Sequence, residues 1–315
     1  FKVPIRKAGL INAAKGVLKR EYQNCQALEN ISFNIEPGEL VGYIGPNGAG
    51  KSTTVKIMSG IMVPDSGECS IMNRIPWKNR KAHVAGIGVV FGQRSQLWWD
   101  VPVTDSFELL KDIYRVDDYS YKKNRNELIE RLDLADLLNV PVRQLSLGQK
   151  MRCEFAASLL HSPSILFLDE PTIGLDAVSK IKMREFIRDI NRDRGITVIL
   201  TTHDMDDIEA LCRRVMVIGK GKILYDGNIA GLRREADMDR RMCIDFFEDV
   251  TVFSAEDAIV ESIQGNQVIL SYKSCDTTAT RLLSTISSSY EIRDVTVENI
   301  PIEKIIARLY EVYSL

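Results

Sequence analysis

The sequence lacks the features of a membrane-spanning or disulfide-bonded chain. A membrane helix needs roughly 20 mostly apolar residues, and the longest uncharged run, 155–168, is interrupted by His161 and Pro163. The six cysteines are scattered and form no C-x-x-C pair, which indicates reduced thiols rather than a disulfide framework or a zinc site. The basic stretch Phe1–Arg20 has no signal-peptide core. We therefore expect a soluble, intracellular protein.

The sequence also lacks a large excess of either charge, internal repeats and low-complexity tracts. It contains 41 Lys and Arg against 43 Asp and Glu, for a net charge of -2, which argues against a dedicated nucleic-acid binder. Hydrophobic residues make up 45% and charged residues 27%, which excludes intrinsic disorder. At about 150 residues per domain, the 315 residues indicate two domains.

Short apolar runs alternate with helical patterns through the larger, first part of the chain. The runs are rich in Val, Ile and Leu and lack polar alternation, as buried parallel strands do. They are Leu40–Ile44, Ile87–Phe91, Ile165–Leu168, Thr197–Thr201 and Val215–Ile218. We predict an α/β domain over 21–232 with a mostly parallel sheet, after an N-terminal extension at 1–20. Asp105–Leu138 predicts an inserted helical subdomain, at about 94–160.

The pattern changes after the charged stretch Arg233–Arg241, which we interpret as a linker. Strands are expected at Met242–Phe247, Val268–Tyr272 and Glu291–Val297, with a Gly265–Asn266 turn before the second. Helices are expected near Thr278–Ser287 and after Pro301, the latter with Ile302, Ile305, Ile306 and Leu309 on one face. The sequence therefore predicts a small α+β domain at 233–315.

A glycine-rich segment, Gly45–Ser52, carries the most specific chemical signal. It reads GPNGAGKS and matches G-x-x-x-x-G-K-[ST] at every fixed position, between the strand Leu40–Ile44 and the helix-compatible Thr53–Met58. Glycines let backbone N–H groups surround a phosphate chain at a helix N-terminus. Lys51 adds charge for the outer phosphates, and the Ser52 hydroxyl can bind Mg²⁺. The segment predicts binding of ATP or GTP.

Two adjacent carboxylates, Asp169 and Glu170, follow the apolar run Ile165–Leu168. Buried charge is costly without a partner, and a metal–phosphate complex supplies one. We expect Asp169 to hold Mg²⁺ through its water shell and Glu170 to orient and polarise the attacking water. The alternative is an exposed acidic pair at a strand end with no chemical role.

A third segment, Leu145–Gln149, reads LSLGQ and precedes a helical pattern. Ser146 and Gln149 fit a capping box, in which each residue's side chain bonds the other's backbone N–H. Taken alone, the segment predicts only a well-capped helix.

The order of these motifs resembles that of the ATP-binding cassette (ABC) ATPases, over about Tyr22–Asp226. Gly45–Thr53 resembles their Walker A loop, Leu145–Gln149 their signature motif and Ile165–Glu170 their Walker B strand. The resemblance also implies roles for Asp176 in a D-loop, His203 as a switch histidine, Gln93 in a Q-loop and Tyr22 stacked on adenine. Leu147 stands where the family usually has glycine; Ser146 and Gly148, which make the contacts, are present, so we expect activity to be kept.

The resemblance implies a mechanism in which two cassettes close head to tail around two ATP molecules. Ser146 and Gly148 would face the γ-phosphate bound by Lys51 of the other subunit. Glu170 would position the water, while His203 and Lys51 would stabilise the transferring phosphoryl group. Ser52, Gln93 and Asp169 are the expected Mg²⁺ ligands. The remaining nucleotide-binding residues are expected to be Gly45, Asn47, Gly48, Gly50, Thr53, Gln149 and Asp176.

The resemblance further implies partners: a second ATPase subunit, forming a homodimer, and integral-membrane permease subunits. The stretch Gly88–Val116, together with the N-terminal stretch Lys7–Arg20, resembles drug, lipid and polysaccharide exporter cassettes. The nearest resemblance is to a viologen-exporter-like subgroup with two different permeases. Trp98 and Trp99 either anchor a permease or pack inside the helical subdomain. The C-terminal domain resembles appendages that support dimer contacts or regulation, or it is an inert module. The expected place is the cytoplasmic face of the cell membrane.

Three other functions are considered from the residues. An importer ATPase carries the same motifs, and a soluble ABC ATPase would act on nucleic acid or ribosomes instead. The stretch from Lys51 to Ser146 is too short for the long coiled coil of DNA-repair members, and ribosome-acting members normally carry two cassettes in one chain. A purely structural nucleotide-binding module is disfavoured by Glu170 and His203. We therefore expect a transport ATPase that binds no nucleic acid.

Overall fold

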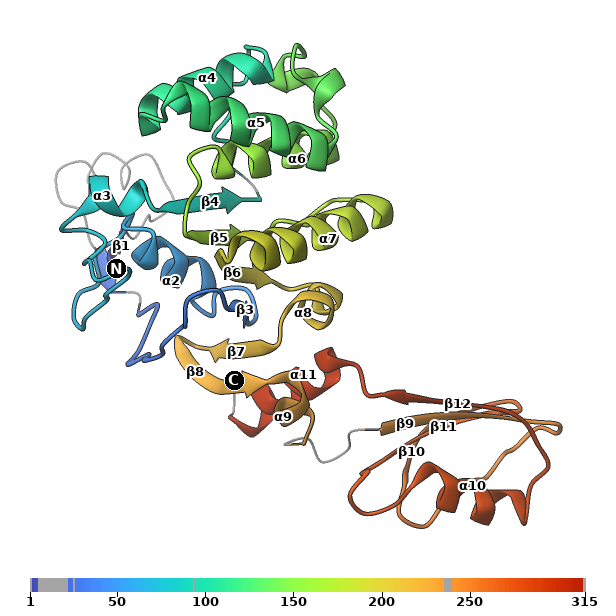
Figure 1. Cartoon of the computed structure of the whole chain (residues 1–315). Helices are drawn as coiled ribbons and strands as arrows, with labels where there is room; N and C mark the ends of the chain where they lie inside the picture. Colours follow the sequence, from blue (N-terminus) through green and yellow to red (C-terminus); the bar gives the residue numbers. More distant parts are fainter. Residues whose placement is uncertain (1, 5–21, 25, 93, 235–239, 314–315) are drawn as a thin grey trace, which may run out of the picture. The chain divides into compact units, whose positions relative to one another are not determined.

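The computed structural model describes residues 2–4, 22–24, 26–92, 94–234 and 240–313 (Figure 1). The chain divides into two compact units, 1–226 and 227–315. Near its start, the short strands β1 (Lys2–Pro4) and β2 (Tyr22–Asn24) pair antiparallel, so the predicted N-terminal extension contains a strand.

A six-stranded sheet forms the centre of the first unit. Its strands are β3 (Leu40–Ile44), β4 (Ile87–Phe91), β5 (Ile165–Asp169), β6 (Thr197–Thr202), β7 (Arg214–Gly219) and β8 (Lys222–Asn228), in the order β4-β5-β6-β3-β7-β8. The pairs β4·β5, β5·β6, β6·β3 and β3·β7 are parallel. The predicted α/β class and five of the strands are confirmed, whereas β8 was not predicted because its residues are only half-buried or exposed.

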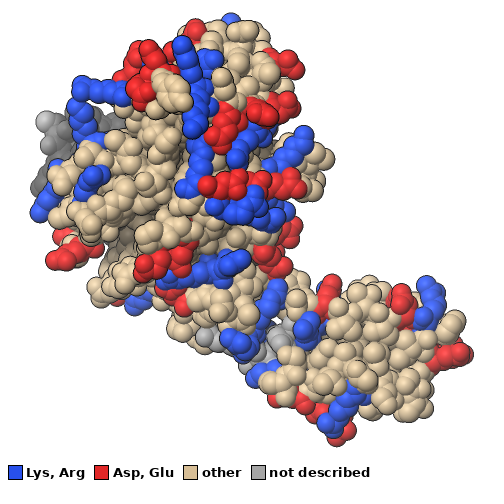
Figure 2. All heavy atoms as spheres, in the orientation of Figure 1, with Lys and Arg blue, Asp and Glu red and all other residues tan. Residues whose placement is uncertain are grey.

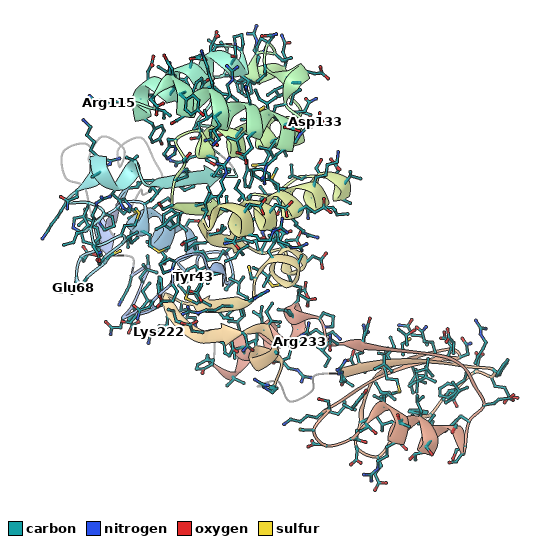
Figure 3. The ribbon with its side chains drawn as sticks, in the orientation of Figure 1. Tyr43, Glu68, Arg115, Asp133, Lys222 and Arg233 are labelled. Carbon is teal, nitrogen blue, oxygen red and sulfur yellow. The ribbon has the colours of Figure 1, made fainter. Side chains whose placement is uncertain are left out.

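Helices of two kinds accompany this sheet. Those following strands or loops of the sheet are α2 (Lys51–Met58), α3 (Arg80–Val84), α7 (Ala177–Arg194) and α8 (Met205–Leu211). The predicted helical insertion contains α4 (Val103–Tyr114), α5 (Asp118–Leu132), the 3-10 turns Ala135–Leu137 and Val142–Gln144, and α6 (Leu147–Leu159), which lie together beyond β4 (Figure 1). Left-handed residues Arg115 and Asp133, labelled in Figure 3, end α4 and α5.

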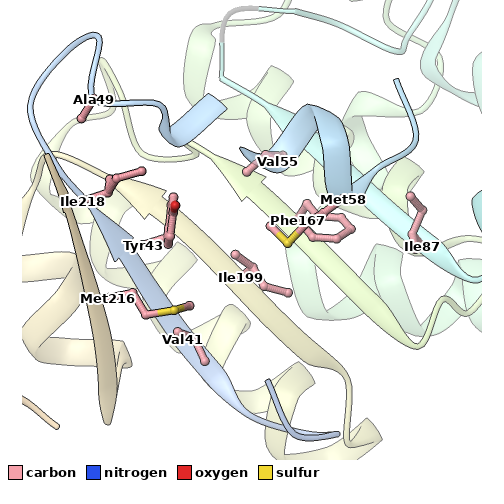
Figure 4. Packing of buried hydrophobic residues seen from close by; sticks show 10 residues of the cluster. All are labelled: Val41, Tyr43, Ala49, Val55, Met58, Ile87, Phe167, Ile199, Met216 and Ile218. Carbon is pink, nitrogen blue, oxygen red and sulfur yellow. The ribbon is translucent and has the colours of Figure 1, made fainter. Parts of the chain in front are cut away.

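One hydrophobic cluster of the first unit lies between α2 and the sheet (Figure 4). Val55 and Met58 of α2 pack with Tyr43, Phe167 and other strand residues, all buried. Burial raises the pKa of Tyr43 to about 12, although its hydroxyl bonds Thr54 Oγ1 at 3.1 Å. This packing holds α2 on the sheet, and so places the loop that leads into α2 at the end of β3.

The second unit is a four-stranded antiparallel sheet with helices. Its strands are β9 (Arg240–Phe246), β10 (Ile259–Gln264), β11 (Gln267–Tyr272) and β12 (Ile292–Asn299), in the order β10-β11-β9-β12. Its helices are α9 (Ile229–Arg234), α10 (Ala279–Ser287) and α11 (Ile302–Val312). Leu282 and Ile286 of α10 pack on buried residues of the sheet, including Phe246.

The predicted linker Arg233–Arg241 is wrong at both ends. Arg233 and Arg234 end α9, and Arg240 and Arg241 begin β9. Arg233 Nη1 donates to the carbonyl oxygen of Ile300 at 2.5 Å, and α9 contacts α11, so α9 belongs to the second unit. The boundary at 226/227 therefore precedes the predicted one at 232/233, which falls inside α9.

On the face shown in Figure 2, basic and acidic side chains of the described residues are interspersed and do not gather into a patch of one charge. None of the described helices combines the length and apolarity that crossing a membrane requires.

Candidate active site

The loop 45–50 joins the carboxyl end of β3 to α2 and is shaped by glycine. Gly50 has a φ of 114° and caps α2. A Cβ at Gly45 would lie 2.4 Å from the carbonyl oxygen of Ile218, so only glycine fits there. Asn47 and Gly48 are exposed at the tip of the loop. The exposed part of the loop, 46–48, thus leads into the start of α2, and the N-terminus of a helix favours an anion.

Lys51 is the first residue of α2 and is only 7% exposed. Its Nζ donates to the carbonyl oxygens of Gly45, at 2.6 Å, and Pro46, at 3.3 Å, so the side chain folds back over the loop. Burial lowers the pKa of Lys51, and the nearby carboxylates of Glu170 and Asp169 partly oppose that shift. The positive charge therefore lies at the mouth of the loop with two acidic groups close by.

Asp169, at the carboxyl end of β5, connects α2 to β6. Its Oδ1 accepts hydrogen bonds from Ser52 Oγ of α2, at 3.2 Å, and from Thr201 Oγ1 of β6, at 2.5 Å. Asp169 and Thr201 are register partners in neighbouring parallel strands, so their side chains meet at one edge of the sheet. Thr201 is fully buried and was not predicted as a site residue, because a threonine in a β-branched run looks like any strand residue.

Glu170 and His203 are in direct contact. Nδ1 of His203, just beyond β6, lies 2.6 Å from Oε2 of Glu170, with 21% of the Glu170 side chain and 61% of the His203 side chain exposed. The two residues are 33 positions apart in the sequence. A half-buried carboxylate and an exposed imidazole in one hydrogen bond can orient a water molecule and move a proton.

The backbone of Glu170 is strained. Its φ is 57°, a left-handed value that is unfavourable for a residue with a Cβ. Its N–H donates to the carbonyl oxygen of Thr201 at 2.9 Å. Close by, Gly92 N donates to the carbonyl oxygen of Asp169 at 2.8 Å, and a Cβ on Gly92 would lie 2.2 Å from the carbonyl oxygen of Glu170. The turn at Glu170 thus depends on glycine in the segment after β4.

The LSLGQ segment forms the predicted capping box at the start of α6. Ser146 Oγ accepts from Gln149 N at 3.2 Å, and Ser146 N donates to Gln149 Oε1 at 2.9 Å. Ser146 is exposed, so the capped helix start faces solvent. An anion approaching this end would meet the positive pole of a 13-residue helix.

The start of α6 touches the start of α7. A Cβ on Gly148 would lie 3.1 Å from Ser179 Oγ, and one on Gly174 would lie 2.8 Å from Leu147 Cδ2. Asp176 caps α7, accepting from Ser179 N at 2.9 Å and Ser179 Oγ at 2.7 Å. The backbone N–H of Ser179 lowers the pKa of Asp176.

The structure therefore brings the predicted site residues into two groups. One is the loop before α2 with Asp169, Glu170 and His203, and the other is the paired starts of α6 and α7. Thr53 is half-buried in α2. Tyr22 is the first residue of β2. Gln93 lies outside the described residues, as does most of the N-terminal extension.

The two tryptophans after position 93 are exposed rather than packed inside the helical subdomain. Trp98 is 41% and Trp99 57% exposed. Lys150 Nζ of α6 lies 5.3 Å from the centroid of the Trp99 ring, and Trp98 N donates to Ser106 Oγ at 3.1 Å. Both rings are available at the surface of the helical subdomain.

The chemistry of the first group fits a magnesium–nucleotide complex. Ser52 and Asp169 present two hard oxygen donors side by side. No group of three or more His, Cys, Asp or Glu residues within the described part of the chain could hold a metal alone. Mg²⁺ commonly takes one or two protein oxygens and completes its shell with water and substrate phosphates, which is what this pair allows.

A parallel sheet with a glycine-rich loop, a lysine at the start of the next helix and acids at a neighbouring strand end defines a P-loop nucleoside triphosphatase. Residues 28–173 match the family model described as ABC transporter. The chain belongs to the ABC transporter ATP-binding family, and it is an ATP hydrolase.

Relatives named for drug resistance and for import are both similar to this chain. The linearmycin resistance ATP-binding protein LnrL of Bacillus subtilis is 30% identical over 247 residues, 78% of this chain and 77% of that protein. The methionine import ATP-binding protein MetN 3 of Bacillus cereus is 34% identical over 235 residues, 73% and 68% of the two chains. A dimeric post-hydrolysis structure of the cassette MJ0796 with ADP and Pi is 27% identical, with a TM-score of 0.59, covering 72% of this chain and 96% of that one.

Proposed function

We propose that this chain hydrolyses ATP to drive export of a substrate through separate transmembrane permease subunits. The observation that carries the proposal is the hydrogen-bonded set at the carboxyl ends of β5 and β6. Asp169 joins Ser52 of the phosphate loop to Thr201, and Glu170 contacts His203. Phosphoryl transfer depends mainly on positioning and charge stabilisation, and these residues supply both.

In the proposed site, the residues of the first group, around the loop before α2, have different roles. The phosphates are surrounded by residues of the glycine-rich loop and the start of α2: Gly45, Asn47, Gly48, Gly50, Lys51, Ser52 and Thr53. Tyr22 stacks on the adenine. Glu170 orients the attacking water and accepts its proton, and His203 holds the carboxylate in place. Lys51 places positive charge at the transferring group, and the side chains of Lys51 and His203 place N–H donors there. Ser52, Asp169 and Gln93 would hold Mg²⁺, which would neutralise charge on the phosphates.

The second group acts on the nucleotide of another copy. Ser146, Gly148, Gln149 and Asp176 lie at exposed or half-exposed helix starts that favour an anion. The dimeric MJ0796 structure supports a head-to-tail homodimer in which these residues close the partner's site. Leu147 leaves the cap intact, which supports activity despite the departure from the usual family motif.

Export, rather than import, is the proposed direction. The similarity to a linearmycin resistance protein supports it, and the similarity to a methionine import protein keeps import as the second candidate. The exposed Trp98 and Trp99 support a permease contact at the cytoplasmic face of the cell membrane. A viologen-exporter-like complex would pair this ATPase with two different permeases.

Two experiments test the proposal in turn. ATP should double the mass of the Glu170→Gln protein in light scattering, whereas Lys51→Ala should stay monomeric; a monomer in both would contradict head-to-tail closure. The tagged wild-type protein should then purify from gently solubilised membranes with polytopic proteins in stoichiometric amounts. Inside-out vesicles of that complex should accumulate substrate on adding ATP if it exports, and right-side-out cells should accumulate it if it imports.

A further inference from the structure

A buried polar cluster is centred on Asp207 and includes residues close in sequence to Glu170 and His203. Asp207, in the first turn of α8, is fully buried. Its Oδ1 accepts from Arg184 Nε of α7 at 2.5 Å, and its Oδ2 accepts from Thr172 Oγ1. Thr202 Oγ1 lies 3.5 Å from the same Oδ2. A buried carboxylate is costly unless paired and hydrogen-bonded, and this one has partners on both oxygens.

A second carboxylate extends the cluster to the surface. Asp204, which caps α8, forms ion pairs with Lys180 and with Arg184, the latter at 3.4 Å. Its backbone N–H donates to Thr202 Oγ1 at 2.9 Å. Arg184 is thereby shared by two acids of α8, which ties this helix to α7.

The partners of Asp207 occupy specific places in the chain. Thr172 is two residues after Glu170, and Thr202 directly precedes His203. Both threonines are buried, at 3% and 0% exposure, so their hydroxyls have little access to water. Asp207 therefore contacts the two segments that carry the reacting pair, and it does so while fully buried.

We propose that Asp207 is a positioning residue for ATP hydrolysis, holding the segments of Glu170 and His203 in register through Thr172 and Thr202. The inference rests on the roles proposed above for Glu170 and His203. Glu170 keeps a left-handed backbone, which persists only when its surroundings determine it. Asp207 adds to the Thr201 and Gly92 contacts of Glu170 by fixing Thr172, two residues further on, and Arg184 neutralises the charge of Asp207. Displacement of a reacting group by about 1 Å costs roughly 10²-fold in rate.

Thr172 offers a matched pair of variants for the test. Thr172→Val keeps the shape but removes the hydroxyl, and Thr172→Ser keeps the hydroxyl. We expect Thr172→Val and Asp207→Asn to lower kcat for ATP by about 10- to 100-fold with KM for ATP within twofold. Thr172→Ser should stay within about threefold of wild type. If Asp207→Asn fails to fold, Thr172→Val still decides the matter.

Asn124→Ala provides the control for a purely structural role. Asn124 is also a buried polar residue, and its Nδ2 donates to the carbonyl oxygens of Leu159 and Leu160, away from the reacting pair. The Asn124→Ala substitution should lower Tm without changing kcat for ATP. An unchanged kcat in Thr172→Val, or an equal kcat loss in Asn124→Ala at equal Tm, would overturn the inference.

A double variant, Thr172→Val with His203→Ala, distinguishes a failure of this inference from a failure of the proposed function on which it rests. If Asp207 acts through the pair, Thr172→Val should lower kcat much less in the His203→Ala protein than in wild type. Full additivity of the two effects would overturn the inference. An undiminished kcat in His203→Ala alone would instead contradict the role proposed for His203.

Discussion

The two units of the chain use different sheets, and the difference decides where chemistry can gather. In the first unit, the pairs joining β4, β5, β6, β3 and β7 are parallel, so their carboxyl ends share one edge. Residues far apart in the sequence, such as Ser52, Asp169 and Thr201, meet there. Parallel sheets place ligand sites at this edge for that reason.

In the second unit, β9 pairs antiparallel with both β11 and β12, so neighbouring strand ends point in opposite directions. Its residues sort instead by face. Met242, Ile244 and Phe246 are buried, and the alternate residues of β9 are half-buried. The comparison indicates that the first unit carries the catalytic function. In the second unit, the buried face of the sheet mainly supplies stability through packing.

The largest expected effect is the loss of hydrolysis in Glu170→Gln. Gln keeps the shape of the side chain but cannot accept the proton of the attacking water, so turnover should fall about 10³-fold while ATP affinity is nearly unchanged. Phosphate release and nucleotide binding measure the two quantities. The exposed Glu185→Gln on α7 is the control and should match wild type. Rapid turnover in Glu170→Gln would remove Glu170 from the mechanism.

The second prediction separates the units. Phe246 is 1% exposed and packs against Phe253 and Tyr290, with ring centroids 5.7 and 5.3 Å away. Phe246→Ala should lower the free energy of unfolding of the second unit by about 3 kcal/mol or more. ATP hydrolysis by the first unit should remain. Chemical denaturation followed alongside phosphate release tests both points.

The neighbouring residue supplies the control for that change. Phe247 is 59% exposed, so Phe247→Ala should change stability by no more than about 0.5 kcal/mol. A parallel loss of hydrolysis in Phe246→Ala would mean that the second unit takes part in catalysis.

Local sequence patterns predicted most of the first unit and the motif-bearing loops. The apolar runs, the glycine-rich loop and the capping box each depend on neighbours within a few positions. Thr201 was missed because its role comes from register with Asp169 on another strand. Asp207 and Arg184 were missed for the same reason: their contact spans 23 positions, and neither has a distinctive local context.

In the second unit, the prediction failed where burial is partial. Strand β10 is half-buried along most of its length and has a register irregularity between Val260 and Ser262, so its apolar alternation is weak. The charged residues Arg240 and Arg241 were assigned to a linker although they begin β9. Arg241 forms ion pairs with Glu298 on the neighbouring strand β12 and with Glu261 on β10, two strands away, and a single sequence does not reveal these contacts.

The third prediction compares helix caps in the two units. Ser146 caps α6, and Thr278 caps α10 by accepting from Arg281 N at 3.3 Å. Ser146→Ala and Thr278→Ala should each cost about 1 kcal/mol in the unfolding of their own unit. Only Ser146→Ala should also lower ATP turnover, by about tenfold or more, because its helix start is proposed to face a phosphate. Equal turnover in the two variants would contradict that role.

The smallest expected effect is a difference in acid sensitivity between the units. All 3 histidines, His83, His161 and His203, lie in the first unit. Burial lowers the pKa of His83 and of His161, so below pH 6.5 the unfolded chain takes up protons before the folded one. The stability of the first unit should therefore fall as the pH falls, by less than about 0.7 kcal/mol per histidine between pH 6.5 and 6.0.

His161→Gln isolates this contribution. His161 Nε2 lies 2.9 Å from the carbonyl oxygen of Ile87, and its ring stacks on Tyr114 at 3.8 Å between centroids. Gln can still donate to a carbonyl but does not titrate. The free energy of unfolding of the first unit should therefore depend less steeply on pH in this variant. Burial raises the pKa of Glu154, which acts in the opposite direction and is present in both proteins. An unchanged slope would mean that His161 is protonated equally in the folded and unfolded chains.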